Sequence, residues 1–198
     1  MEIFCDKPLL GRVPVFKDGV DYSNYYQIIL NNLFNLNKNK ITLFTSCFAN
    51  EGKSTTTYHL ANLACLEKKI ALINADPKTA KETLKKLVVN KPNKLDYFIL
   101  EDNNLISLIN KIIDVYDHIF IDCSPTLENI DSRNLINNVE SIVFLITDKH
   151  YPCFDIKRGT RNFNDKVIGI IQNKHSWHFS KVCYINTMPN HVTNKLVI

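Results

Sequence analysis

The stretch that decides the fold is residues 41–57, ITLFTSCFANEGKSTTT. It opens with Ile41 to Thr45, a short β-branched and apolar run that predicts a buried strand. Residues 46–52 have no helical period, and apolar residues at helical spacing follow Gly52-Lys53-Ser54. A strand, a loop, Gly-Lys-Ser and a helix, in this order, are the context of a phosphate-binding P-loop.

The residue types in this loop suit phosphate for elementary reasons. Unpaired N–H groups at a helix N-terminus carry partial positive charge. Lys53 adds a full charge for the terminal phosphates, the Ser54 hydroxyl suits Mg²⁺, and Gly52 lets the backbone approach closely. The complete pattern G-x-x-x-x-G-K-[ST] has a glycine where this chain has the small residue Cys47. The phosphate-binding residues we predict are Asn50, Glu51, Gly52, Lys53, Ser54 and Thr55.

The composition limits the class of protein. The chain has 198 residues, which is long enough for one α/β domain with a full core. Of these residues 45% are hydrophobic and 22% charged, a composition that argues against disorder. Its net charge of +4 is spread along the sequence, so we expect no nucleic-acid groove, although weak attraction to an anionic membrane stays open. The six cysteines never form C-x-x-C, which favours reduced thiols in a cytoplasmic protein. We see no apolar stretch of about 18 residues, so we expect no membrane span.

The order of elements predicts the fold class. Prolines and glycines in residues 1–22 indicate an extended arm. The spacing of apolar residues predicts a helix over 21–34 and further helices within 79–110. We therefore divide the chain into an N-terminal arm and helix, 1–35, and a P-loop domain, 36–198. Strands are predicted at 41–45, 69–74, 118–122, 141–146, 167–171 and 182–185. Their alternation with helices indicates an α/β, Rossmann-like P-loop NTPase fold with a mostly parallel sheet and helices on both faces.

Polar residues follow several of these strands, and ligands of such sheets bind at the carboxyl ends of the strands. Asp122 ends an apolar strand in the Walker B arrangement and is a candidate for Mg²⁺, the alternative being a helix cap or loop aspartate. Asp76 is a candidate to orient a nucleophile or bind the water shell of the metal, the alternative being an Asp-Pro turn. Asn173 is a candidate to border adenine. We thus predict Lys53, Asp76 and Asp122 as catalytic, and Ser54, Asp76 and Asp122 as metal-binding.

These motifs resemble the bacterial tyrosine kinases of capsule and exopolysaccharide export, a group of deviant P-loop ATPases. Their Walker A loop S-x-x-P-G-E-G-K-S-T is similar to Ser46–Thr55, and their D-x-D-x-R motif to Asn74–Lys78. Their Walker B motif is similar to Tyr116–Pro125. Three more segments have counterparts, namely an L-G-x-I-P lead-in at Leu10–Pro14, a helical aspartate at Asp131 and a V-x-G-V-V-L-N strand at Val167–Asn173.

The departures from the family pattern bear on activity. Asn74 stands where the family has the first aspartate of D-x-D, and Ala49-Asn50 replaces Pro-Gly. The helical E-x-x-R-x-x-R motif, which the family uses in ring assembly, falls on Asn24, Gln27 and Leu30, and the family's C-terminal tyrosine cluster is missing. We therefore expect no stable ring through this helix and leave self-association of another order open.

The resemblance implies a kinase-like P-loop protein that uses ATP and Mg²⁺. It would transfer the γ-phosphoryl group weakly to protein tyrosines, in polysaccharide synthesis and export. It also implies a membrane-anchored chain-length or adaptor protein as partner, which would hold the chain at the inner face of the membrane. Two alternatives stay open, a pseudokinase that binds ATP as a regulatory module and an ATPase of the partitioning or division-site type. The latter has a lysine early in the loop, where this chain has Phe48.

Overall fold

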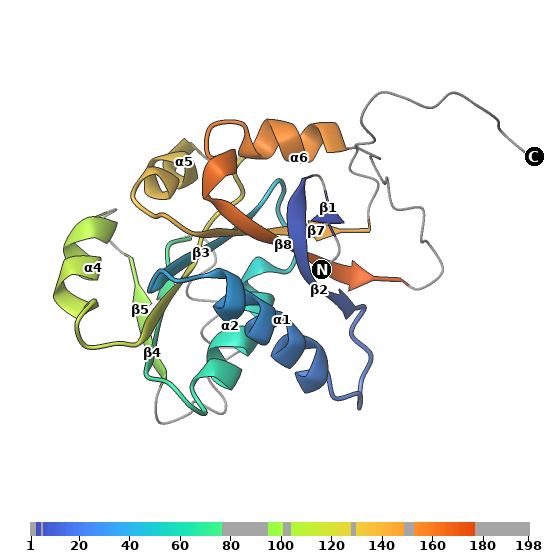
Figure 1. The fold of residues 1–198 in the computed structure, drawn as a ribbon, viewed down its shortest axis with the longest axis horizontal. Helices are drawn as coiled ribbons and strands as arrows, with labels where there is room; N and C mark the ends of the chain where they lie inside the picture. Colours follow the sequence, from blue (N-terminus) through green and yellow to red (C-terminus); the bar gives the residue numbers. More distant parts are fainter. Residues whose placement is uncertain are drawn as a thin grey trace, which may run out of the picture.

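The computed structural model describes residues 3–4, 6–76, 95–100, 104–127, 130–148 and 153–176. Its centre is an eight-stranded sheet with the strand order β1-β2-β8-β7-β3-β6-β4-β5 (Figure 1). The strands are β1 (Ile3–Phe4), β2 (Lys7–Pro14), β3 (Ile41–Ser46), β4 (Ile70–Asn74), β5 (Leu95–Ile99), β6 (His118–Asp122), β7 (Ile142–Thr147) and β8 (Val167–His175). All neighbours pair in parallel except β1 and β2, so the predicted α/β P-loop fold is confirmed.

Helices cover both faces of this sheet. They are α1 (Ser23–Leu36), α2 (Lys53–Ala64), α4 (Leu105–Ile112), α5 (Ile130–Asn137) and α6 (Cys153–Thr160), with a 3₁₀ turn at Asn164–Lys166. In Figure 1, α1 and α2 lie together on one side of the sheet, and α5 and α6 lie on the other. Crossover helices on both faces are what a parallel sheet requires, because its strands join end to end only through long connections.

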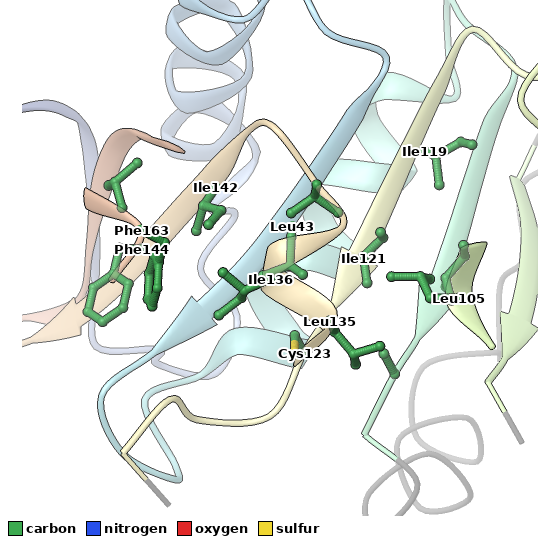
Figure 2. Packing of buried hydrophobic residues seen from close by; sticks show 14 of the residues in the cluster. Leu43, Leu105, Ile119, Ile121, Cys123, Leu135, Ile136, Ile142, Phe144 and Phe163 are labelled. Carbon is green, nitrogen blue, oxygen red and sulfur yellow. The ribbon is translucent and has the colours of Figure 1, made fainter. Parts of the chain in front are cut away.

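The core has two layers because successive strand residues point to opposite faces. In β6, Ile119 and Ile121 pack with one cluster of buried side chains, and Phe120 packs with the other. Figure 2 shows the first layer, where Leu135 and Ile136 of α5 lie over the strands. The second layer packs α1 and α2 against the sheet, and Tyr26, Ile29, Leu30 and Leu33 are buried as the helical spacing of 21–34 predicts.

Two segments differ from the sequence interpretation. Residues 95–99, predicted as part of a helical region, form the strand β5, because Leu95-Asp-Tyr-Phe-Ile pairs along its full length with β4. Pairing with β4 at the edge of the sheet overrides the weak local preference of such a short run. The N-terminal arm contributes β2, which pairs with β8 and buries Leu10 and Val13. The arm therefore belongs to the sheet and its core, while the division at residue 35 stays a prediction.

The remaining predicted elements agree with the structure where it describes them. The strands at 41–45, 69–74, 118–122, 141–146 and 167–171 are confirmed, and α4 confirms the helix expected near residue 110. The predicted strand at 182–185 and the predicted helices at 79–94 lie outside the described residues. No helix in the described part of the chain combines the length and the apolar character needed to cross a bilayer.

Candidate nucleotide-binding site

The P-loop connects β3 to α2 through a tight, partly left-handed backbone. Asn50 has a φ of 61° and Gly52, the N-cap of α2, has a φ of 85°. A left-handed residue at position 52 favours glycine, since a side chain would clash with the backbone. A Cβ on residue 52 would also lie 2.1 Å from the Nδ2 atom of Asn173. The glycine of the motif is thus required for two independent reasons.

Lys53 folds back into the loop. Its Nζ atom donates to Ser46 Oγ at 3.1 Å and lies 3.4 Å from the carbonyl oxygen of Phe48. Lys53 is 7% exposed, and Asp122, Glu51 and Asp76 are close enough to act on its charge. Burial lowers the pKa of Lys53, while these carboxylates favour the ammonium form. The loop therefore holds a buried cation among oxygen atoms, at the place where a P-loop binds phosphate.

Asp122 and Asn74 lie side by side at the carboxyl ends of β6 and β4, where the two are register partners. Both are buried, with exposures of 4% and 1%. Burial raises the pKa of Asp122 to about 6, against a hydrogen bond from Ser54 and the charge of Lys53, which lower it. Among the described residues, Asp122 Oδ1 finds no hydrogen-bond partner. A buried carboxylate oxygen without a protein partner is open to a water molecule, an ion or a ligand.

The oxygen atoms at this point fit Mg²⁺. Asp122 offers a carboxylate and Ser54 a hydroxyl in contact with it, and Asp76 acts electrostatically on the same carboxylate. The described residues contain no group of three or more histidine, cysteine, aspartate or glutamate side chains that would form a complete metal site. Mg²⁺ usually takes one or two carboxylates and completes its shell with water and phosphate oxygens.

Asp76 follows β4 and is half-buried. Its N–H donates to Asn74 Oδ1 at 2.8 Å, so the Asn74 side chain shapes the turn that carries Asp76. Lys53, Ser54, Asp76 and Asp122 are thus brought together as the sequence predicts, and their catalytic and metal-binding roles stay predictions. Asp131 lies in α5.

Glu51 and Asn173 contact the loop itself. Glu51 is buried, and its Oε2 atom accepts the N–H of Phe48 at 3.0 Å. Burial raises the pKa of this carboxyl. The amide of Asn173 donates to the carbonyl oxygen of Glu51 at 2.9 Å. Asn50 is exposed, and Thr55 and Ser54 lie half-buried in the first turn of α2. Contacts of these residues with a nucleotide remain predictions.

Sequence reasoning missed two contributors to the loop. Lys174 donates from Nζ to the carbonyl oxygen of Asn50 at 2.7 Å and has a φ of 55°. Ser46 receives the Lys53 ammonium and donates from its hydroxyl to the carbonyl oxygen of Phe48. The Asn173-Lys174 dipeptide was visible at a strand end, but only the tertiary structure shows that it meets the P-loop.

Comparison with solved structures shows which proteins share this geometry. The chimerical protein CapA2B2 is 17% identical, with a TM-score of 0.69 over 85% of this chain and 95% of that one. The BceF tyrosine kinase domain is 17% identical, with a TM-score of 0.66 over 85% of this chain and 93% of that one. The kinase domain of the Escherichia coli tyrosine kinase ETK is 13% identical, with a TM-score of 0.68 over 84% of this chain and 90% of that one. The chain has the fold of a bacterial tyrosine kinase domain. At these identities the kinase-like fold is what the likeness establishes.

The wider P-loop class also shares the architecture. FlhF complexed with GTP and Mg²⁺ is 19% identical, with a TM-score of 0.53 over 80% of this chain and 68% of that one. No protein-family model and no curated protein matches the sequence. The kinase-like fold is therefore recognised through the shape of the molecule and the motifs at its strand ends.

Proposed function

We propose that this kinase-like P-loop protein binds ATP with Mg²⁺ and transfers the γ-phosphoryl group, weakly, to tyrosine hydroxyls of proteins. The observation that carries the proposal is the buried Lys53 ammonium beside Asp122, whose Oδ1 atom has no partner among the described residues. Phosphoryl transfer depends mainly on positioning and on charge stabilisation, which a buried cation and fixed backbone N–H groups supply.

Each residue has a definable task in this proposal. Lys53 exchanges its contacts with Ser46 and Phe48 for phosphate oxygens, and the N-terminus of α2 holds the phosphates. Ser54 and Asp122 would hold Mg²⁺, with Asp76 beside them. The metal, when bound with the nucleotide, neutralises charge on the phosphates. Asp76, which is half-buried and follows β4, would orient the attacking hydroxyl.

The cellular setting is part of the same proposal. A membrane-anchored chain-length or adaptor protein of capsular or exopolysaccharide synthesis would hold the chain at the inner face of the membrane. If this is right, protein-free liposomes at physiological salt will bind the chain weakly, and liposomes that carry the adaptor will bind it strongly. Equal sedimentation with both would contradict the partner.

Nucleotide binding is tested with Lys53→Ala. Removing this charged contact should weaken binding of Mg²⁺-ATP by about 2–3 kcal/mol. Isothermal titration calorimetry measures the affinity, and Lys38→Ala is the matched control, because Lys38 is an exposed lysine in the connection between α1 and β3. The same affinity in wild type and Lys53→Ala would contradict nucleotide binding at this loop.

Transfer is tested by incubation with labelled ATP and Mg²⁺, followed by phosphoamino-acid analysis. We expect faint phosphotyrosine in wild type and none in Lys53→Met. The second candidate function, a pseudokinase module, is favoured by the buried Asn74 amide beside Asp122, where the resembled family carries a carboxylate. It predicts nucleotide binding without phosphotyrosine, so calorimetry and transfer together separate the two functions.

A further inference from the structure

The carboxyl end of β8 meets the P-loop at two consecutive carbonyl groups. Lys174 Nζ donates to the carbonyl oxygen of Asn50 at 2.7 Å, and Asn173 Nδ2 donates to that of Glu51 at 2.9 Å. Asn173 is 2% exposed and packs where a Cβ of residue 52 would lie. The Asn173–Lys174 pair therefore contacts the part of the loop that holds the two left-handed residues, Asn50 and Gly52.

These two contacts set the direction of two peptide units. The C=O and the N–H of a trans peptide are rigidly coplanar and point in opposite directions. Since the carbonyl oxygens of Asn50 and Glu51 are held at β8, the N–H groups of Glu51 and Gly52 point away from β8. In a P-loop, the backbone N–H groups cradle the phosphates. Asn173 and Lys174 thus orient the backbone N–H groups that would bind phosphate, although their own side chains donate hydrogen bonds to the carbonyl oxygens of the loop.

The end of β8 is itself firmly anchored. The Asp148 carboxylate accepts hydrogen bonds from Gln172 Nε2 at 2.6 Å, from His175 Nδ1 at 3.1 Å and from the Ser176 N–H. Arg12 of β2 donates from Nε to Gln172 Oε1 at 2.9 Å. Consecutive strand residues ordinarily point to opposite faces. The left-handed φ of 55° at Lys174 lets both members of the pair reach one loop.

We infer that Asn173 and Lys174 are positioning residues that preorganise the P-loop backbone for a polyphosphate. This inference rests on the proposed nucleotide binding. It gives Asn173 and Lys174 a role toward the phosphates of the nucleotide, whereas the sequence predicted that Asn173 borders the adenine base. Preorganised donors bind more tightly because the ordering cost is met before the ligand arrives. Breaking the pair should then weaken every polyphosphate ligand by a similar factor, whether or not it carries a base.

The test compares Mg²⁺-ATP with Mg²⁺-tripolyphosphate, which has no base or sugar, by calorimetry. Lys174→Met is the main variant because Lys174 is exposed and its replacement leaves the core intact. We expect about tenfold weaker binding of both ligands, the size of one lost hydrogen bond. Lys174→Arg, which keeps a charged donor, should restore part of the loss, and Lys38→Met, at an exposed lysine elsewhere, should change neither affinity.

Asn173→Ala should give a loss of the same kind, with circular dichroism and melting temperature recorded to show that the variant is folded. Unchanged affinities for both ligands in Lys174→Met would overturn the inference. A loss confined to ATP would overturn it as well, because it would place the pair at the base. A wild-type protein that binds neither ligand would contradict the proposed function, which is a separate outcome.

Discussion

At the scale of single residues, Asn74 and Asp122 differ in negative charge, the property that lets a side chain hold Mg²⁺ or accept a proton. The two are register partners at the ends of β4 and β6, and both are buried. Asn74 keeps the shape of an aspartate and holds the turn to Asp76 through its Oδ1 atom. An amide cannot act as a base, however, and it holds Mg²⁺ less strongly than a carboxylate.

We therefore predict that Asn74→Asp raises autophosphorylation. The variant keeps an oxygen for the N–H of Asp76 and adds a carboxylate beside Asp122, and general-base assistance is typically worth about 10²–10⁴-fold in rate. Phosphotyrosine formed per hour is measured on the protein and on a tyrosine-rich peptide, with Lys53→Met as the inactive control. Equal signals from wild type, Asn74→Asp and Lys53→Met would end the kinase proposal and leave a nucleotide-binding module.

At the scale of elements, α1, α2 and the N-terminal arm meet through a stack of rings. His59 of α2 lies 4.9 Å from the ring of Tyr26 and 5.9 Å from that of Phe16, both measured between centroids. Burial lowers the pKa of His59, so folding favours the neutral form of this imidazole. The unfolded chain protonates this side chain below about pH 6.5. The stabilisation from neutral His59 is thus complete above that pH and is lost as the pH falls through the folded pKa.

The prediction is that the free energy of unfolding decreases more between pH 7.5 and about 5.5 in wild type than in His59→Phe. Phenylalanine keeps the stacking but does not titrate. Urea unfolding at the two pH values measures the difference. Burial also lowers the pKa of His118. This histidine lowers the free energy of unfolding at acid pH equally in wild type and His59→Phe, so its effect cancels when the two proteins are compared. Identical decreases in the two proteins would show that His59 does not contribute.

At the scale of the whole molecule, the sheet joins the N-terminal arm to the P-loop domain in one core. Leu10 of β2 is fully buried and packs beside Gly169 of β8, where a Cβ would lie 2.6 Å from its Cγ. Val13 of the same strand is also fully buried, in the layer that α1 and α2 cover. We therefore expect the arm and the domain to unfold in one transition.

Leu10→Ala should destabilise the protein by about 2–5 kcal/mol, the usual range for a truncated core leucine. Leu66→Ala is the matched control, since Leu66 is 69% exposed and its truncation should change stability by less than about 0.5 kcal/mol. Chemical unfolding followed by fluorescence and by circular dichroism measures both. A Leu10→Ala protein with wild-type stability would mean that the arm is not part of the cooperative unit.

The sequence by itself determined the P-loop, the parallel sheet and the strand-end residues. Residues 41–57 carry the pattern of a strand, a turn with one glycine and a helix, and an apolar run leads to Asp122. Both patterns depend only on neighbours in the chain. Only the tertiary structure decided that residues 95–99 form a strand, because an edge strand is defined by its partner β4. It also decided that Asn74 borders Asp122 and that Lys174 reaches Asn50 across 124 positions of the sequence. Such contacts arise from register and crossover, which no local pattern encodes.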